Sequence, residues 1–305
     1  MPQLNQESLT APVPVSPGEQ LRLMHVHAHP DDESSKGAAS TARYVAEGVA
    51  VTVVSCTGGE RGDVLNPAVD TEHTRANLAQ VRLAEMAEAV RVLGVEHHWL
   101  GFVDSGYPQP DESGVMPDLP ADCFALVPLE VSAPPLAGLI RRGRPHVLTT
   151  YDENGGYPHP DHIRCHEVSM AAVRLAADPN FVDGQEPWQV HKVYYHAGFH
   201  YDRVKALHDA MVAAGQESRF AAWLDGWDHS GDREVTTRVH CEVAHFEVRD
   251  AALRAHATQI DPNVWLQFPA SAQHAVWPTE DFELAMAWVP VPSVEDDLFA
   301  GVRPT

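Results

Sequence analysis

Two short segments of this sequence place imidazole and carboxylate groups beside a proline. They read HPDD at residues 29–32 and HPDH at residues 159–162. Imidazole and carboxylate are two of the ligand types that bind zinc in proteins. One such segment alone means little, because aspartate and proline are both common in turns. Two of them in one chain favour a shared metal site.

The residue types suggest a division of roles. His29, Asp32 and His162 make a two-histidine, one-carboxylate set, which is the composition of a catalytic zinc site with one position left open for water. Zinc lowers the pKa of bound water to about 7 and polarises a carbonyl, so an amide becomes hydrolysable near neutral pH. Asp31 adjoins the ligand Asp32 on a turn, where neighbouring side chains diverge. It is therefore the candidate general base.

Three further residues are candidates for supporting roles. His159 is expected to stay unligated and to act as a general acid or a charge-stabilising group, while Asp161 is placed to orient a histidine. Tyr157 is a candidate hydrogen-bond donor to the developing oxyanion. The glycines at 155 and 156 would let this loop close on a substrate.

Apolar runs predict strands that lead into both segments. Residues 21–28 and 146–151 predict strands, and residues 50–56 are continuously apolar and rich in β-branched side chains. Uninterrupted apolar strands are typical of a parallel sheet covered on both faces. Ligands of open parallel sheets bind outside the carboxyl ends of the strands. We therefore expect both segments on the same rim of an α/β sheet.

The remaining elements are predicted from periodicity and from turn residues. Residues 101–135, rich in Pro, Gly and Asp, predict a long surface loop. Further helices and strands are expected at 36–47 (capped by Ser34 and Ser35), 77–93, 99–100, 136–142, 163–177, 193–197, 204–214 and 243–258. No repeat or linker forces a cut, so we expect a single catalytic domain over 21–305. Its sheet core would span about 21–198, with a carboxyl-terminal elaboration at about 199–305 and a flexible tail at 1–20.

Composition excludes some classes of partner. The 305 residues carry 21 Lys and Arg against 43 Asp and Glu, a net charge of -22, which argues against nucleic acid because phosphate backbones need clustered basic side chains. This charge suits a small neutral or metal-bound substrate, although surface solvation explains it equally well. No apolar run predicts a membrane helix, and residues 1–20 lack the pattern of a signal peptide. The oligomeric state stays open.

Other residues of reactive type carry weaker signals. The widely spaced Cys56, Cys123, Cys165 and Cys241 predict free thiols and a cytoplasmic protein. The glycine-rich loop at 58–62 is not a Gly-x-Gly-x-x-Gly fingerprint and follows the second strand, so a dinucleotide cofactor is disfavoured. Most of the 19 histidines, including those at 97–98, 191, 196 and 200, are assigned to the surface or to packing. The tryptophans are assigned to the core, with the alternative that one or two line an apolar pocket.

With these motifs the chain resembles the LmbE-like (PIG-L type) zinc N-deacetylases. The resemblance is carried by HAHPDDESSKGA at 27–38, TGGERGDVLNPA at 57–68, LGVEHHWLGFVDSG at 93–106, TYDENGGYPHPDHIRCH at 150–166 and LRAHATQIDPN at 253–263. It implies a Rossmann-like fold and a Zn²⁺ ion, with Fe²⁺ as an alternative, held by His29, Asp32 and His162. It also implies Asp31 as base, with His159 and Tyr157 stabilising the tetrahedral intermediate.

The resemblance further implies a substrate. Arg82 and Asp104 match positions that hold inositol-glucosamine, and Lys36 matches the branch that cleaves mycothiol S-conjugates, although a solvated lysine would look the same. Asp63 stands where the family has glutamate, which leaves a substrate contact there open. The expected activity is hydrolysis of the cysteinyl-glucosamine amide of a mycothiol S-conjugate. The alternative is deacetylation of N-acetylglucosaminyl-inositol or of a related thiol precursor.

Two other classes fit the residues less well. A catalytically silent sugar-binding module would not need Asp31 and His159, since a binder requires ligands but no proton-transfer groups. A metallophosphoesterase would need more ligands, because the sequence offers those of one metal only. The sequence therefore favours the hypothesis that this protein is an amide hydrolase.

Overall fold

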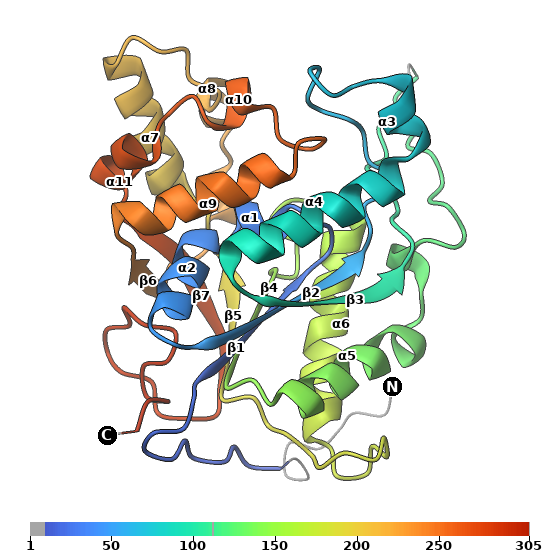
Figure 1. The fold of residues 1–305 in the computed structure, drawn as a ribbon, viewed down its shortest axis with the longest axis vertical. Helices are drawn as coiled ribbons and strands as arrows, with labels where there is room; N and C mark the ends of the chain where they lie inside the picture. The colour runs from blue at the N-terminus through green and yellow to red at the C-terminus, as the bar shows by residue number, and fades with distance from the viewer. Residues whose placement is uncertain (1–9, 112, 305) are drawn as a thin grey trace.

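The fold is a seven-stranded sheet with helices on both faces (Figure 1). The computed structural model describes residues 10–111 and 113–304. The strands are β1 Arg22–His27, β2 Ala50–Thr57, β3 Glu96–Phe102, β4 Val147–Thr150, β5 Lys192–His196, β6 Thr237–His240 and β7 Thr279–Ala287. The helices are α1 Asp32–Ser35, α2 Ala38–Ala46, α3 Glu72–Ala76, α4 Leu78–Leu93, α5 Leu129–Gly143, α6 Pro160–Ala177, α7 Tyr201–Ala213, α8 Ala221–Asp225, α9 Val243–Ala255, α10 Pro262–Trp265 and α11 Ala270–Val276, with 3₁₀ turns η2 Phe124–Leu126 and η3 His229–Gly231.

The strand order is β3-β2-β1-β4-β5-β7-β6, and the first five strands are parallel. The chain therefore builds outward from β1 through β2 and β3, then returns to add β4 on the other side of β1. This reversal of strand order makes the carboxyl ends of β1 and β4 a ligand-binding crevice in α/β folds. The predicted Rossmann-like, mostly parallel α/β fold is confirmed.

Side chains of β1 alternate between the two faces of the sheet and join a hydrophobic core on each face. Met24 and Val26 pack on one face with the apolar sides of α5 and α6, whereas Leu23 packs on the other face with residues of α2. Figure 1 shows α2, α4 and α9 together over one side of the sheet and α5 and α6 over the other. Each face of β1 is thus covered, as expected for a strand inside a parallel sheet.

Two strands of the sheet come from the carboxyl-terminal third. β7 pairs antiparallel with β5, and β6 pairs antiparallel with β7. The sheet therefore extends beyond the expected core of 21–198. Periodicity did not indicate these strands, because β6 is only four residues long and β7 carries acidic residues among its apolar ones.

The predicted loop at 101–135 is too long at its carboxyl end. α5 begins at Leu129 and contains both Pro134 and Pro135. The backbone acceptors that these prolines leave without a helical donor, at Glu130 and Val131, belong to exposed residues rather than to the buried face of the helix. Burial of the opposite face of α5 against α6 outweighs the proline cost.

Three smaller predictions also need correction. Ser34 and Ser35 do not cap the second helix, which begins at Ala38 after Gly37 at φ 82°. Part of the expected tail is attached to the body, since the Thr10 amide donates to Ala177 O and Val15 is buried. Residues 1–9 lie outside the described residues. The tryptophans at 223, 227, 265, 277 and 288 are at most partly buried rather than core residues.

Candidate metal and active site

The two histidine-proline-aspartate segments meet at the crevice between β1 and β4. Residues 29–32 follow β1 directly, and residues 159–162 form the start of α6 after the loop that follows β4. α6 begins at Pro160, three residues before the predicted start, because proline suits the first helical position and His159 caps the helix. The expectation that both segments share one rim is confirmed.

Asp32 lies between the other two expected ligands. Asp32 Oδ2 lies 3.6 Å from His29 Nδ1 and 3.5 Å from His162 Nε2. These separations are close to those of ligand atoms that share a tetrahedral zinc ion, whose bonds are about 2.0–2.2 Å long. The donor set is the mixed imidazole and carboxylate set that zinc accepts. The residues therefore fit the metal that their types predict.

His162 is oriented for ligation by the glycine loop. Its Nδ1 lies 3.0 Å from Gly155 O, which leaves Nε2 as the ligand atom, and this buried nitrogen has no hydrogen-bond partner among the described residues. Gly155 has φ 77°, and a Cβ there would come within 2.7 Å of the His162 Cβ. Only glycine permits this close approach.

Two residues hold Asp32 from other sides. The Tyr151 hydroxyl donates to Asp32 Oδ2 at 2.5 Å, and Lys36 Nζ lies 2.5 Å from Asp32 Oδ1. Burial would raise the pKa of Asp32, but Lys36 and the two histidines lower it well below its usual range. Sequence reasoning missed Tyr151, whose only signal is its place at the end of β4. Sequence reasoning also missed the contact of Lys36 with this carboxylate, and its expected role in substrate binding stays a prediction.

His29 is held on its far side by two carboxylates. Its Nε2 lies 3.3 Å from Asp161 Oδ2 and 3.5 Å from Asp104 Oδ1. Burial lowers the pKa of His29, but Asp104, Asp161 and Asp32 outweigh burial and raise it well above its usual value. The Ser105 amide also donates to Asp161 Oδ2. Asp161 thus makes the histidine contact that its expected orienting role requires.

Asp31 occupies a strained position beside the ligands. It is half-buried at φ 100°, a conformation that is rare for residues other than glycine. Burial and the neighbouring Asp32 raise the pKa of its carboxyl to about 6. Strain of this kind collects at functional sites, and a carboxyl pKa near neutrality suits a base that must take and release a proton.

His159 is buried next to the expected ligands, and Tyr157 lies nearby at the surface. His159 Nδ1 accepts the Asp161 amide, so the neutral ring carries its hydrogen on Nε2, and burial lowers its pKa to about 4. Its ring lies 4.5 Å from that of His29 and 5.2 Å from that of Tyr107. Tyr157 is 43% exposed, with its ring 4.6 Å from that of His162. Nitrogens of His29, His159 and His162 also lie within 4.8 Å of one another, an alternative ligand set.

Arg82 lies beneath the glycine-rich loop and not in the open crevice. It is 3% exposed, and its guanidinium donates to the carbonyls of Gly59 and Asp63. Asp104, also buried, accepts the amides of Arg61 and Gly106. In this conformation both residues shape the loops that surround the site, and a direct substrate contact by either stays a prediction.

Comparison with known proteins identifies the family. Residues 24–173 match the PIG-L family, described as GlcNAc-PI de-N-acetylase. The chain is 52% identical to a mycothiol S-conjugate amidase of Streptomyces coelicolor, over 93% of this chain and 98% of that relative. The chain belongs to the PIG-L family. A second member, a 1D-myo-inositol 2-acetamido-2-deoxy-alpha-D-glucopyranoside deacetylase of Thermobispora bispora, is 40% identical over 92% of this chain and 98% of its own.

Solved structures share the fold of this chain. An N,N'-diacetylchitobiose deacetylase of Pyrococcus horikoshii matches with a TM-score of 0.59 at 19% identity, covering 93% of this chain and 86% of that chain. A conserved protein of Thermus thermophilus matches with a TM-score of 0.57 at 23% identity, covering 90% and 98%. Membership of the PIG-L family makes this chain a metal-dependent hydrolase of linear amide bonds.

Two further predictions are tested by the structure. The four cysteines are free, as expected, and the structure shows that all four are buried. None of the helices in the described part of the chain combines the length and the apolar character needed to span a bilayer.

Proposed function

We propose that this protein is a zinc-dependent amidase that cleaves the cysteinyl-glucosamine amide of mycothiol S-conjugates in the cytoplasm. The products are an N-acetylcysteine S-conjugate and glucosaminyl-inositol, which is a step of thiol-based detoxification. The observation that carries the proposal is the 52% identity to a mycothiol S-conjugate amidase along nearly the whole of both chains. Identity to the deacetylase of Thermobispora bispora is 40% over a similar span.

His29, Asp32 and His162 would hold the ion, and Fe²⁺ is the alternative to Zn²⁺. When bound, the ion supplies Lewis acidity, which polarises the amide carbonyl and makes water more acidic. The Asp31 carboxylate takes a proton from the attacking water, so that oxygen bonds to the carbonyl carbon. The amide C–N bond then breaks as Asp31 passes this proton to the glucosamine nitrogen, which leaves as an amine.

Two groups act on the tetrahedral intermediate. The Nε2–H of His159 and the Tyr157 hydroxyl are donors for the developing oxyanion, and donors fixed before reaction stabilise such charge without reorganisation. His159 stands at the helix start, where Asp161 fixes its tautomer through the backbone amide. Asp161 itself keeps His29 oriented through the contact at Nε2.

A cavity beside the site supports a large acyl group. It is lined by aromatic residues such as Tyr157, Phe199 and Trp227, and by the charged Lys36 and Arg233. Seven of its sixteen lining residues come from the carboxyl-terminal third, while the loop after β3 contributes Asp104 and Tyr107 on the other side of the crevice. The cavity is a place for the S-linked substituent, and Lys36, Arg82 and Asp104 are the proposed substrate residues.

The second candidate activity is deacetylation of N-acetylglucosaminyl-inositol, supported by the relative at 40% identity. The deciding experiment compares kcat/KM of the zinc-loaded protein for a mycothiol S-conjugate and for N-acetylglucosaminyl-inositol. We expect the conjugate to be preferred. Equal or better turnover of N-acetylglucosaminyl-inositol would contradict the amidase assignment and favour the deacetylase.

A further inference from the structure

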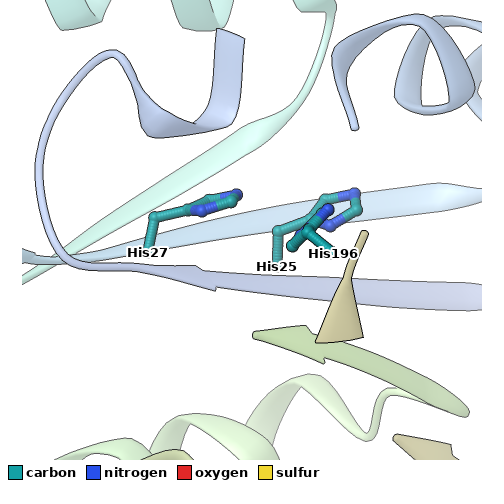
Figure 2. A group of neighbouring side chains, drawn as sticks. All are labelled: His25, His27 and His196. Carbon is teal, nitrogen blue, oxygen red and sulfur yellow. The ribbon is translucent and has the colours of Figure 1, made fainter. Parts of the chain in front are cut away.

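A second group of histidines lies inside the sheet, outside the site described above. His25 and His27 belong to β1, and His196 is the last residue of β5. One nitrogen from each ring lies within 4.8 Å of those of the other two. Figure 2 shows His25 and His27 leaving the same side of their strand, with His196 beside His25. The proposed function uses none of these three side chains.

Strand alternation places these imidazoles where apolar side chains are expected. Side chains two residues apart share a face, so His25 and His27 follow Leu23 on the side covered by α2. Leu23 there packs among apolar residues such as Tyr44 and Val51. A polar ring buried in this layer costs free energy unless its nitrogens are paired.

His27 is buried without a partner. It is 1% exposed, and neither of its ring nitrogens has a hydrogen-bond partner within 10–111 and 113–304. A buried polar group in that state costs about 1–3 kcal/mol. Coordination of an ion would use one of these lone pairs.

Threonines hold the other two rings. Thr149 Oγ1 lies 2.6 Å from His25 Nδ1 and 2.8 Å from His196 Nε2, and Thr41 Oγ1 lies 2.9 Å from His25 Nε2. Metal-bound histidines usually have their second nitrogen hydrogen-bonded in this way. His25 would release one of its two threonine contacts on ligation. Burial lowers the pKa of His25 to about 3 and that of His196 well below its usual value, which keeps both rings neutral.

The backbone at Gly37 leaves room for the ring of His196, which borders the cavity. Gly37 has φ 82°, and a Cβ there would lie 2.7 Å from His196 Cε1. His196 also lines the cavity shared with Lys36 and Tyr151. His196 is therefore the member of the cluster that borders this cavity.

We propose that His25, His27 and His196 form a second metal site for a borderline divalent cation such as Zn²⁺. Three neutral imidazoles are a known zinc ligand set, and they also suit Co²⁺, Ni²⁺ and Cu²⁺. Bound there, the cation joins the central strand β1 to β5 across β4. The site is separate from the one at His29, Asp32 and His162, although residues two apart on β1 lie only about 6–7 Å from one another.

Cobalt titration of the full chain after removal of metal by a chelator tests this site. We expect two Co²⁺ per wild-type chain, and one in a variant with Asp32→Ala and His162→Ala. The His27→Leu variant should bind one Co²⁺, and the triple variant none. His27→Leu is the sharpest change because His27 has no hydrogen bond to lose within the described residues. If it does not fold, His196→Val takes its place.

A second readout needs no activity. Zn²⁺ should raise the Tm of the Asp32→Ala/His162→Ala variant, and the addition of His27→Leu should abolish this rise. Equal Co²⁺ stoichiometry in the wild type and in His27→Leu would overturn the proposal. So would an unchanged Zn²⁺ effect on Tm in the triple variant.

Discussion

At the scale of single residues, the adjacent carboxylates Asp31 and Asp32 have different surroundings and different proposed roles. Asp32 points to both histidines and is held by Tyr151 and Lys36, whereas the neighbouring Asp31 sits at φ 100° with a carboxyl pKa raised to about 6. The residue types predicted that Asp32 lies near His29 and His162, as it does, and their role as ligands stays a prediction. They could not predict Tyr151, because its role depends on the register of β4 beside β1.

The first prediction concerns the base. Asp31→Asn should lower kcat by roughly 10²–10⁴-fold, the usual contribution of a positioned base, because the amide cannot take a proton from water. Zinc content measured on the same preparation should stay at the wild-type level. Retention of near wild-type kcat would show that Asp31 is not the base.

The second prediction concerns Tyr151. Tyr151→Phe removes the 2.5 Å hydrogen bond to Asp32 Oδ2 and should weaken zinc binding by about 10–100-fold, as loss of a ligand's supporting contact typically does. Competition with a chromophoric chelator measures this affinity. Tyr195→Phe on the neighbouring strand is the matched control and should bind zinc normally. Equal affinities in both variants would show that Tyr151 does not support the ligand.

At the scale of elements, sequence patterns predicted those that are long or strongly apolar. β1, β2, β4, α4 and α6 lie close to their predicted ranges. The early start of α5 was missed because its proline pair reads locally as a loop, while the burial that stabilises it is tertiary. The three-histidine cluster was also missed, because it joins His25 on β1 to His196 on β5, far apart in the sequence.

The third prediction concerns the contact between α9 and α1. His256 follows α9, and its Nε2 lies 2.7 Å from Glu33 Oε1. Burial lowers the pKa of His256, but Glu33 outweighs burial and raises it above 6.5. Burial would raise the pKa of Glu33, but His256 lowers it to about 2. The stabilisation by His256 is thus complete below pH 6.5 and lost as pH rises through the raised pKa, whereas that by Glu33 is present above pH 4.5.

His256→Gln should therefore lower the free energy of unfolding by about 3 kcal/mol at pH 5.5, the cost of breaking a buried ion pair, and by less at pH 9. Urea unfolding at the two pH values measures the difference. His240→Gln, an exposed histidine on β6, is the control and should show no such dependence. A loss that is equal at both pH values would exclude a charged pair.

At the scale of the whole molecule, the carboxyl-terminal third adds two strands to the sheet and contributes part of the cavity lining. β7 covers the edge of β5, and Lys192 of β5 makes a buried ion pair with Glu295. The parts before and after residue 198 thus share one sheet. We propose that they unfold as one domain.

The fourth prediction follows from this joint sheet. Glu295→Gln leaves the Lys192 charge buried without a counter-charge and should cost about 3 kcal/mol. Calorimetry of the wild type should show one transition, and the variant should show one transition at lower temperature. Two separate transitions in either protein would contradict a single cooperative unit.

Because β1 lies inside the sheet, the strand that precedes the metal-binding turn should open only rarely. β1 is hydrogen-bonded to β2 on one side and to β4 on the other, and His29 follows it directly. Amide protons in such a strand exchange with solvent only when the sheet opens as a whole. Deuterium uptake should therefore be slowest around Val26. Spontaneous loss of the ion should be governed by the cavity mouth, where the half-exposed Tyr157 lies, and not by unravelling of the strand that carries its ligands.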